Sequence, residues 1–291
     1  MDSFVILSVG DIFVFIYVGI IFYVCRFQME CFRPITIRNP DKFQIAGYYI
    51  QVPCGKCPAC LSNRREQWSY RLACEQRVAK YCLFMTYTYC DDNLPVFHKV
   101  RGDITFGLGS CVVNDDISFV LIKNHLQGYL KLLRELLRRK DCQLRYYAIG
   151  EYGEHTYRPH YHALLFFDYS GFVPPSEIND LVAKCWHNGN VKFGYVSPRS
   201  IRYVLKDMVK QQYKNSDYVK KIICNDCEIF APFCIMSRRP GIGSAWFEKH
   251  EDFFLRAIQD VTTIVSDGHF VSIPRYFKDK YFNQFQMIFL T

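Results

Sequence analysis

The spacing of apolar and polar residues predicts alternating strands and helices from about residue 30 onward. Alternation, or a β-branched and aromatic composition, predicts strands at 30–53, 82–92, 143–153, 191–197 and in the run that begins at residue 160. Helical spacing is found at 59–81, 124–140, 175–186 and 197–213. The stretch 94–118 contains glycines and no clear period, so we expect an irregular excursion away from the sheet.

The order of these elements indicates an α+β fold. A strand, a helix, a pair of strands, a helix, a strand and a helix follow one another. This order favours an antiparallel sheet covered by helices over a doubly wound parallel sheet. Ser62 and Ser176 are candidate N-caps of two of the helices.

Residues 4–25 form an apolar run that is long enough to span a bilayer, although Asp11 interrupts it. Three interpretations are open: a membrane anchor, an uncleaved signal, and an extension upstream of the working protein. No small-residue cleavage site follows clearly, and Met29 would be a natural first residue for a soluble domain. We favour the extension, with membrane contact by residues 4–25 as the second interpretation.

Composition argues against a disordered chain and favours a polyanionic partner. Half of the 291 residues are hydrophobic, which allows a sizeable core. The formal net charge of +8 favours a polyanion, although many basic proteins bind none. The chain has 14 cysteines, three of them in PCGKCPAC, too close together for three independent disulfide loops. A reduced, intracellular protein with a metal site fits this usage better than a secreted disulfide scaffold.

The clustered cysteines follow the Cys-x-x-Cys-x-x-Cys spacing of a Zn²⁺ knuckle, and they are Cys54, Cys57 and Cys60. A tetrahedral ion needs one more ligand, for which the candidates are Cys31, Cys74 and Cys82. An iron–sulfur cluster and three thiols without metal are the alternatives. Cys224 and Cys227 form a further Cys-x-x-Cys, which we interpret as a reduced turn in preference to a second site.

Two histidines one residue apart open the apolar run YRPHYHALLFFDY. Because alternate residues of a strand point to the same face, His160 and His162 project together. Glu151 lies near the end of the preceding strand, and a hairpin would bring its carboxylate to the same face. Two imidazoles and a carboxylate suit Mg²⁺ or Mn²⁺ acting on a phosphate. Taken alone, a His-x-His pair is more often packing than a metal site.

Tyr203 and Lys206 lie three residues apart in the predicted helix 197–213 and therefore on one face of it. A tyrosine hydroxyl is a covalent nucleophile when a neighbour supports its ionised form, and Lys206 could do this or hold the phosphate. A phosphotyrosyl ester conserves the energy of the DNA backbone bond, so cleavage by a tyrosine is reversible. A Tyr-x-x-Lys pair also arises by chance in a chain with 21 tyrosines.

Together these residues resemble the HUH endonucleases, which nick single-stranded DNA through a tyrosine. The chain is most similar to the replication initiators of gokushovirus-type microviruses, which are small single-stranded DNA phages. The matching stretches are VPCGKCPACLSNRREQWSYRL, FMTYTYCDDNLP, GEYGEHTYRPHYHALLF, YVLK and MSRRPGIGSAWF. They follow in this order from about residue 50 to residue 247, and the later stretch DGHFVSIPRYFKDKY is similar as well.

The resemblance implies a rolling-circle initiator on a central antiparallel sheet of about five strands, HUH- or ferredoxin-like, flanked by helices. The histidine pair would bind the metal, with Glu151 as third ligand, and Tyr203 would be the nucleophile, assisted by Lys206. Some relatives carry a second tyrosine near the first on this helix. Here the next one is Tyr213, so we expect single-tyrosine chemistry.

The resemblance also suggests four regions along the chain. They are a hydrophobic extension, a Cys-rich region with a basic helix, the HUH-type core, and a C-terminal helix and hairpin, at 1–28, 29–81, 82–247 and 248–291. Basic side chains of two regions are candidate contacts to DNA phosphates, and they are Arg64, Arg65, Arg238 and Arg239. A solvated basic loop is the alternative for the second pair.

The expected partners are single-stranded DNA at a replication origin and host replication proteins, in the cytoplasm of the host bacterium. Two alternatives stay open for the activity. One is a zinc-containing nucleic-acid-binding protein without catalysis. The other is a transposase or relaxase of the same superfamily, which shares the chemistry and differs in biological role.

Overall fold

The computed structural model describes residues 5–9, 12–17, 20–24, 30–39, 48–98, 100–107, 117–209, 231–250, 263–266, 269–277 and 280. The chain divides into two compact units. One unit is Cys74–Ile242, which contains the largest sheet of the described residues. The other unit combines Met1–Ala73 with Gly243–Thr291.

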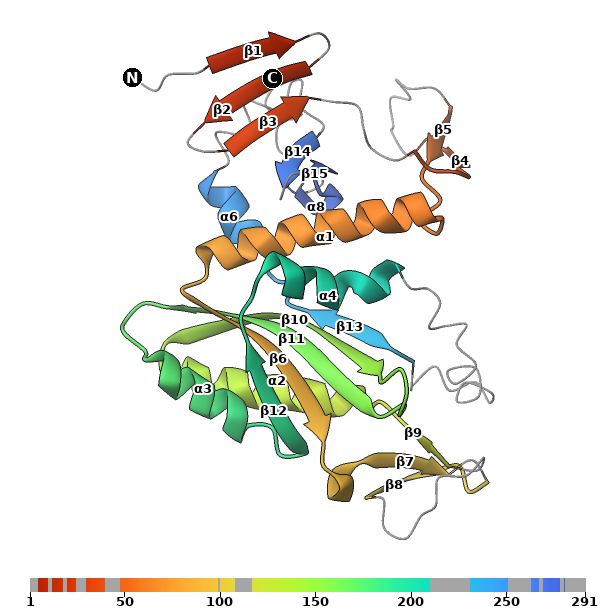
Figure 1. The fold of residues 1–291 in the computed structure, drawn as a ribbon, viewed down its shortest axis with the longest axis vertical. Helices are drawn as coiled ribbons and strands as arrows, with labels where there is room; N and C mark the ends of the chain where they lie inside the picture. The colour runs from red at the N-terminus through yellow and green to blue at the C-terminus, as the bar shows by residue number, and fades with distance from the viewer. Residues whose placement is uncertain are drawn as a thin grey trace. The chain divides into compact units, whose positions relative to one another are not determined.

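The unit Cys74–Ile242 is built on a five-stranded sheet in the order β12-β6-β11-β10-β13 (Figure 1). Every neighbouring pair in it is antiparallel. The strands are β6 Tyr81–Tyr89, β10 Cys142–Tyr152, β11 Pro159–Tyr169, β12 Gly189–Gly194 and β13 Phe233–Met236. The predicted α+β class, with an antiparallel sheet flanked by helices, is confirmed.

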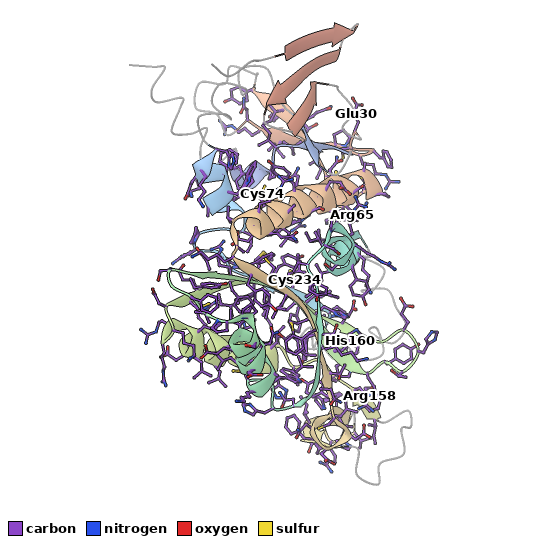
Figure 2. All side chains as sticks on the ribbon, turned by 60° about the vertical axis from the view of Figure 1, so that its left-hand side comes forward. Glu30, Arg65, Cys74, Arg158, His160 and Cys234 are labelled. Atoms are coloured by element: carbon purple, nitrogen blue, oxygen red, sulfur yellow. The ribbon has the colours of Figure 1, made fainter. Side chains whose placement is uncertain are left out.

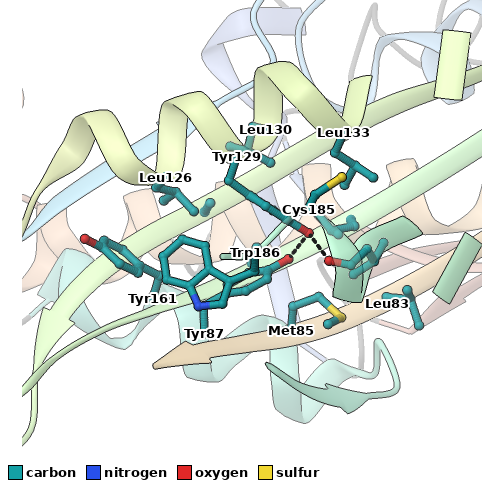
Figure 3. Close-up of a cluster of buried hydrophobic side chains, with 14 of the residues drawn as sticks. Leu83, Met85, Tyr87, Leu126, Tyr129, Leu130, Leu133, Tyr161, Cys185 and Trp186 are labelled. Atoms are coloured by element: carbon teal, nitrogen blue, oxygen red, sulfur yellow. Dashed lines mark hydrogen bonds between the residues drawn. The ribbon is translucent and has the colours of Figure 1, made fainter. Parts of the chain in front are cut away.

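One face of this sheet is covered by helices α2 Lys123–Arg138 and α3 Pro175–Lys184 (Figure 1). Side chains from alternate strand positions, among them Tyr87 and Tyr161, are fully buried in this layer. Figure 2 shows how densely side chains fill this unit. Tyr129 of α2 donates a hydrogen bond to the carbonyl of Val182 at 3.3 Å and accepts one from the Tyr87 hydroxyl at 2.7 Å (Figure 3). The phenols therefore satisfy one another within the apolar core.

The opposite face of the sheet carries α4 Pro198–Val209 and the end of α1 Pro58–Val78. Glu75 of α1 forms a buried ion pair with Arg145 of β10. The same guanidinium donates to the carbonyls of Pro240 and Gly241 at 3.0 and 2.8 Å. Arg145 thereby fixes the Pro-Gly turn that follows β13.

The stretch 94–118 is more regular than its composition suggests. The strands β7 Pro95–His98, β8 Asp103–Phe106 and β9 Ile117–Phe119 form an antiparallel sheet in the order β8-β7-β9. Gly102, at φ 71°, makes the turn between β7 and β8 and donates to the carbonyl of His98 at 2.7 Å. The expectation of an irregular segment was wrong, because this glycine forms a tight hairpin turn.

The two expected serine caps were also wrong. Helix α1 begins at Pro58, four residues before Ser62, and α3 begins at Pro175, one residue before Ser176. Both helices therefore start at a proline, whose fixed φ suits the first helical position and whose missing N–H is not needed there.

The second unit contains several small elements. These are β1 Val5–Val9, β2 Ile12–Tyr17, β3 Ile20–Val24, β4 Ile35–Arg38, β5 Tyr49–Val52, α6 Ser244–Lys249, β14 Thr263–Ser266, β15 His269–Ser272 and α8 Arg275–Phe277. The described part of the apolar run 4–25 forms the antiparallel strands β1, β2 and β3. Within the described ranges, none of the helices has the length and apolarity needed to cross a bilayer.

Candidate functional site

The pairing of β10 with β11 brings Glu151 and the two histidines together. Glu151 lies opposite His160, and Ile149 lies opposite His162, in an antiparallel register. Because side chains alternate along a strand, the carboxylate and both imidazoles project from the same face. The predicted hairpin is therefore confirmed, and the face is the one that α4 covers.

The three side chains converge on one carboxylate oxygen. Glu151 Oε1 lies 3.0 Å from His160 Nε2 and 3.1 Å from His162 Nε2. Their possible ligand atoms all lie within 4.8 Å of one another, so the group could hold a metal ion. Glu151 and His162 are buried and His160 is half-buried, as can be followed from His160 in Figure 2.

Hydrogen bonds to the outer ring nitrogens suit both histidines for metal binding. His160 Nδ1 lies 3.3 Å from the carbonyl of Arg158, which can only accept, so Nδ1 carries the proton. In the neutral ring, Nε2 then presents a lone pair to Glu151 Oε1, and two such atoms at 3.0 Å need a cation between them. Thr86 Oγ1 lies 2.9 Å from His162 Nδ1 and can fix that ring in the same way.

Tyr203 and Lys206 reach this group from α4. The Tyr203 hydroxyl lies 3.3 Å from both Glu151 Oε1 and His162 Nε2. Lys206 Nζ lies 3.4 Å from Glu151 Oε1 and 3.9 Å from the centroid of the Tyr203 ring. Burial raises the pKa of Tyr203, and the neighbouring Lys206 ammonium opposes this by favouring the ionised phenol. The side chain of Tyr203 is nevertheless 39% exposed, so a large substrate can approach it.

Phe84 is a member of this site that the sequence did not reveal. Its ring stacks on His162 at a centroid distance of 5.7 Å and meets the Tyr203 ring edge-on at 6.0 Å. It thus holds the metal-ligand candidate and the hydroxyl-bearing ring in position. The signal was available, because Phe84 precedes Thr86 by two residues and so shares its face of β6.

The cysteine cluster contains four thiols. Cys31 joins the three predicted cysteines, and neither Cys74 nor Cys82 belongs to the cluster, which we call the four-thiol group: Cys31, Cys54, Cys57 and Cys60. The sulfurs of Cys54 and Cys60 lie 4.0 Å apart and those of Cys57 and Cys31 lie 3.8 Å apart. A disulfide requires about 2.05 Å, whereas four bonds of about 2.3 Å to a tetrahedral ion place sulfurs about 3.8 Å apart.

Backbone N–H groups prepare these thiols to bind as thiolates. The N–H of Cys57 donates to the sulfur of Cys54 at 3.3 Å, and the N–H of Cys54 donates to Cys31 at 3.2 Å. A backbone hydrogen bond at Cys60 lowers the pKa of Cys57 to about 6. Donation from the backbone of Lys56 likewise lowers the pKa of Cys54. The four-thiol group could therefore hold a thiophilic metal ion.

The predicted basic side chains lie at different places. Arg64 is exposed on α1, whereas Arg65 forms an ion pair with Glu66 at 3.0 Å. Arg238 and Arg239 are exposed at the turn that Arg145 fixes. His125, which lies in α2 and receives contact from Tyr89, is a helix-start residue as predicted. The predictions on Cys224, Cys227 and Tyr213 lie outside the described residues.

Residues 82–212 match the family model of the ORF2-type replication-associated proteins. Replication-associated protein VP4 of Bdellovibrio phage phiMH2K is 28% identical over 87% of this chain and 77% of its own length. Replication-associated protein ORF2 of Spiroplasma virus 4 is 30% identical over 47% of this chain and 44% of its own length. Replication-associated protein ORF4 of Chlamydia phage 1 is 22% identical over 81% of this chain and 55% of its own length. No solved structure matches the chain.

The family match covers the part of the chain that carries the site. It includes Glu151, the histidine pair and helix α4 with Tyr203 and Lys206. The relatives are replication-associated proteins of three different phages or viruses. The chain therefore belongs to the family of ORF2-type replication-associated proteins, and within it to the gokushovirus type that its motifs resemble.

Proposed function

We propose that this chain initiates rolling-circle replication of a phage genome by nicking and rejoining single-stranded DNA at the origin. The nick would pass through a covalent 5′-phosphotyrosine on Tyr203. The relatives' names support a role in phage replication. On this proposal the catalytic core is residues 82–247, and the protein works in the host bacterial cytoplasm together with host replication proteins.

The observation that supports nicking most directly is the position of the Tyr203 hydroxyl. It lies 3.3 Å from His162 Nε2 beside a buried group of two imidazoles and a carboxylate. A nucleophile beside a site for a divalent cation is the arrangement that phosphoryl transfer needs. A phenol in a purely structural role has no need of 39% exposure next to two potential metal ligands.

Glu151, His160 and His162 would hold Mg²⁺ or Mn²⁺. The nitrogen and oxygen donors, with Thr86 and the Arg158 carbonyl behind the histidines, fit such an ion. When bound there, the ion supplies a Lewis acid for a phosphate oxygen. The protein's own contribution is to hold the rings in one tautomer.

Tyr203 would carry out the cleavage step. Its oxygen attacks the scissile phosphorus, the new Tyr203 O–P bond forms and the P–O3′ bond breaks. The phenolic proton leaves to solvent, and the departing 3′ oxygen takes up a proton, so that a free 3′ hydroxyl can prime synthesis. Lys206, 3.9 Å from the ring centroid, stabilises the phenolate and balances charge near the phosphate. Rejoining is the reverse of these steps.

The four-thiol group would hold Zn²⁺. Four thiolates at tetrahedral spacing are the ligand set of a structural zinc ion. This ion is of a different chemical class from the one at Glu151 and the histidines, and we assign it no part in the reaction.

A comparison of two tyrosine variants tests the proposed activity. Tyr203→Phe should abolish both nicking and the covalent adduct on single-stranded origin DNA with Mn²⁺, while DNA binding persists. Tyr195→Phe is the matched control, because Tyr195 is 88% exposed and lies just before α4. Its adduct should be unchanged. If the wild-type chain forms no adduct on any origin strand, the protein is a non-catalytic nucleic-acid-binding protein instead.

A further inference from the structure

The hairpin formed by β4 and β5 exposes one complete face. Arg38 pairs with Tyr49 and Thr36 pairs with Gln51, so these four side chains share a face. All four are exposed. The other face carries isoleucine and valine at every position. The exposed face therefore presents a guanidinium, a phenol, a hydroxyl and an amide side by side.

Aromatic and cationic side chains continue around this hairpin. Phe32, Tyr48 and Tyr49 are 67%, 54% and 66% exposed. Arg38 lies over the Tyr48 ring, 5.1 Å from its centroid, and donates to its hydroxyl at 3.1 Å. Arg33 and Lys56 are exposed as well. The described segments 31–39 and 48–57 contain these three cations and no acidic residue.

The four-thiol group closes the base of this hairpin. Cys31 lies four residues before β4, and Cys54 lies two residues after β5. The N–H of Cys54 donates to the sulfur of Cys31 at 3.2 Å, which joins the two ends directly. Cys60 lies in the first turn of α1. A metal ion bound by the four thiols would therefore fix the hairpin to the start of that helix.

We propose that this metal-closed hairpin is a second binding site for single-stranded DNA, separate from the nicking site. Tyr49 and Phe32 would stack on bases, and Arg33, Arg38 and Lys56 would contact phosphates. The inference rests on the proposed function in one respect, namely that the chain acts on single-stranded DNA.

The chemistry of the surface favours a single strand over other partners. Bases of a single strand are free to stack on exposed aromatic rings, whereas the bases of a duplex are already stacked on one another. Exposed cations without neighbouring acids suit a phosphate backbone. The amide of Gln51 and the hydroxyl of Thr36 can each donate and accept hydrogen bonds, which suits the edges of unpaired bases.

Binding of a fluorescein-labelled oligothymidine to full-length variants tests this site. Tyr49→Ala should weaken binding about tenfold or more through loss of stacking, with an unchanged salt dependence. Arg38→Ala should also weaken binding, and the slope of log K against log salt should fall by about 0.7 for one lost phosphate contact. Arg138→Ala and Phe172→Ala are matched controls on exposed positions of the other unit, and both should bind as the wild type does.

Cys31→Ser tests the role of the metal. This variant should lose zinc, measured by elemental analysis, and should bind oligothymidine as weakly as the double variant Arg38→Ala/Tyr49→Ala. Should Cys31→Ser fail to fold, the two surface variants still decide the question, because they leave the thiols intact.

Unchanged affinity and salt slope in both Arg38→Ala and Tyr49→Ala would overturn the inference. Nicking of an origin strand, measured in parallel, separates this outcome from failure of the proposed function. Nicking with unaffected binding removes only the hairpin site. Weakened binding in a chain that never nicks removes only the nuclease.

Discussion

At the scale of single residues, one carboxylate oxygen organises the site. Glu151 Oε1 lies within 3.4 Å of two imidazole nitrogens, one phenol and one ammonium, and these belong to His160, His162, Tyr203 and Lys206. A buried carboxylate surrounded by donors stays in one rotamer, so it fixes the relative positions of all four groups. Such a preorganised arrangement reduces the rearrangement that a reaction would require.

Most of this residue-level arrangement could be predicted from sequence. Alternation places His160 and His162 on one face, and a hairpin to the preceding strand adds Glu151. The distance of Tyr203 from them could not be derived, because it depends on how α4 crosses the sheet. Phe84 was missed for a related reason: an aromatic residue in a strand is usually core, and only the folded site shows that it contacts His162.

Replacing Thr86 with valine should weaken metal binding without unfolding the protein. The change removes the hydrogen bond at 2.9 Å to His162 Nδ1, which holds the ring in its metal-binding tautomer. Loss of such a supporting contact typically lowers metal affinity about 10- to 100-fold. A titration of nicking activity against Mn²⁺ concentration measures the shift. Thr105→Val is the control, because it removes an equivalent bond to His98 in another sheet. Equal Mn²⁺ requirements in both variants would contradict the role of Thr86.

At the scale of elements, the sheet has two chemically different faces. The face under α2 and α3 is a dense aromatic core, in which tyrosine hydroxyls bond to one another. The face under α4 carries the polar site. The strands and long helices were predictable because their periods are strong. The helix starts and the β7–β8–β9 sheet were not, because proline and glycine gave signals that have more than one structural use.

Tyr129→Phe should destabilise the fold by about 1–3 kcal/mol, because it leaves the buried Tyr87 hydroxyl without its acceptor. Tyr87→Phe/Tyr129→Phe should cost less than the sum of the two single changes, since the double variant buries no unsatisfied hydroxyl from the pair. Urea denaturation of the three variants measures the coupling. Strictly additive losses would show that the two phenols do not depend on each other.

At the scale of the whole molecule, two metal sites of different chemistry are expected in separate units. Glu151 and the histidines offer oxygen and nitrogen, whereas the four-thiol group offers only sulfur. Hard divalent ions prefer the first set and zinc prefers the second. Catalysis and structural stability should therefore respond to different reagents.

Removal of loosely held Mg²⁺ or Mn²⁺ by brief dialysis against a chelator should stop nicking and leave the zinc in place. Adding Mn²⁺ back should restore activity. A mercurial reagent should instead release about one zinc ion per chain, detected with a chromogenic dye, and lower the thermal stability. Zinc release that accompanies the loss of nicking in the first treatment would contradict two independent sites.

The most direct test of the central claim is mass mapping of the DNA-linked peptide. The wild-type chain is incubated with single-stranded origin DNA and Mn²⁺, then digested with protease and nuclease. We predict that the remaining nucleotide is attached through a 5′ phosphate to the side chain of Tyr203. A nucleotide found on another residue, or a nicked strand without any adduct, would contradict the account.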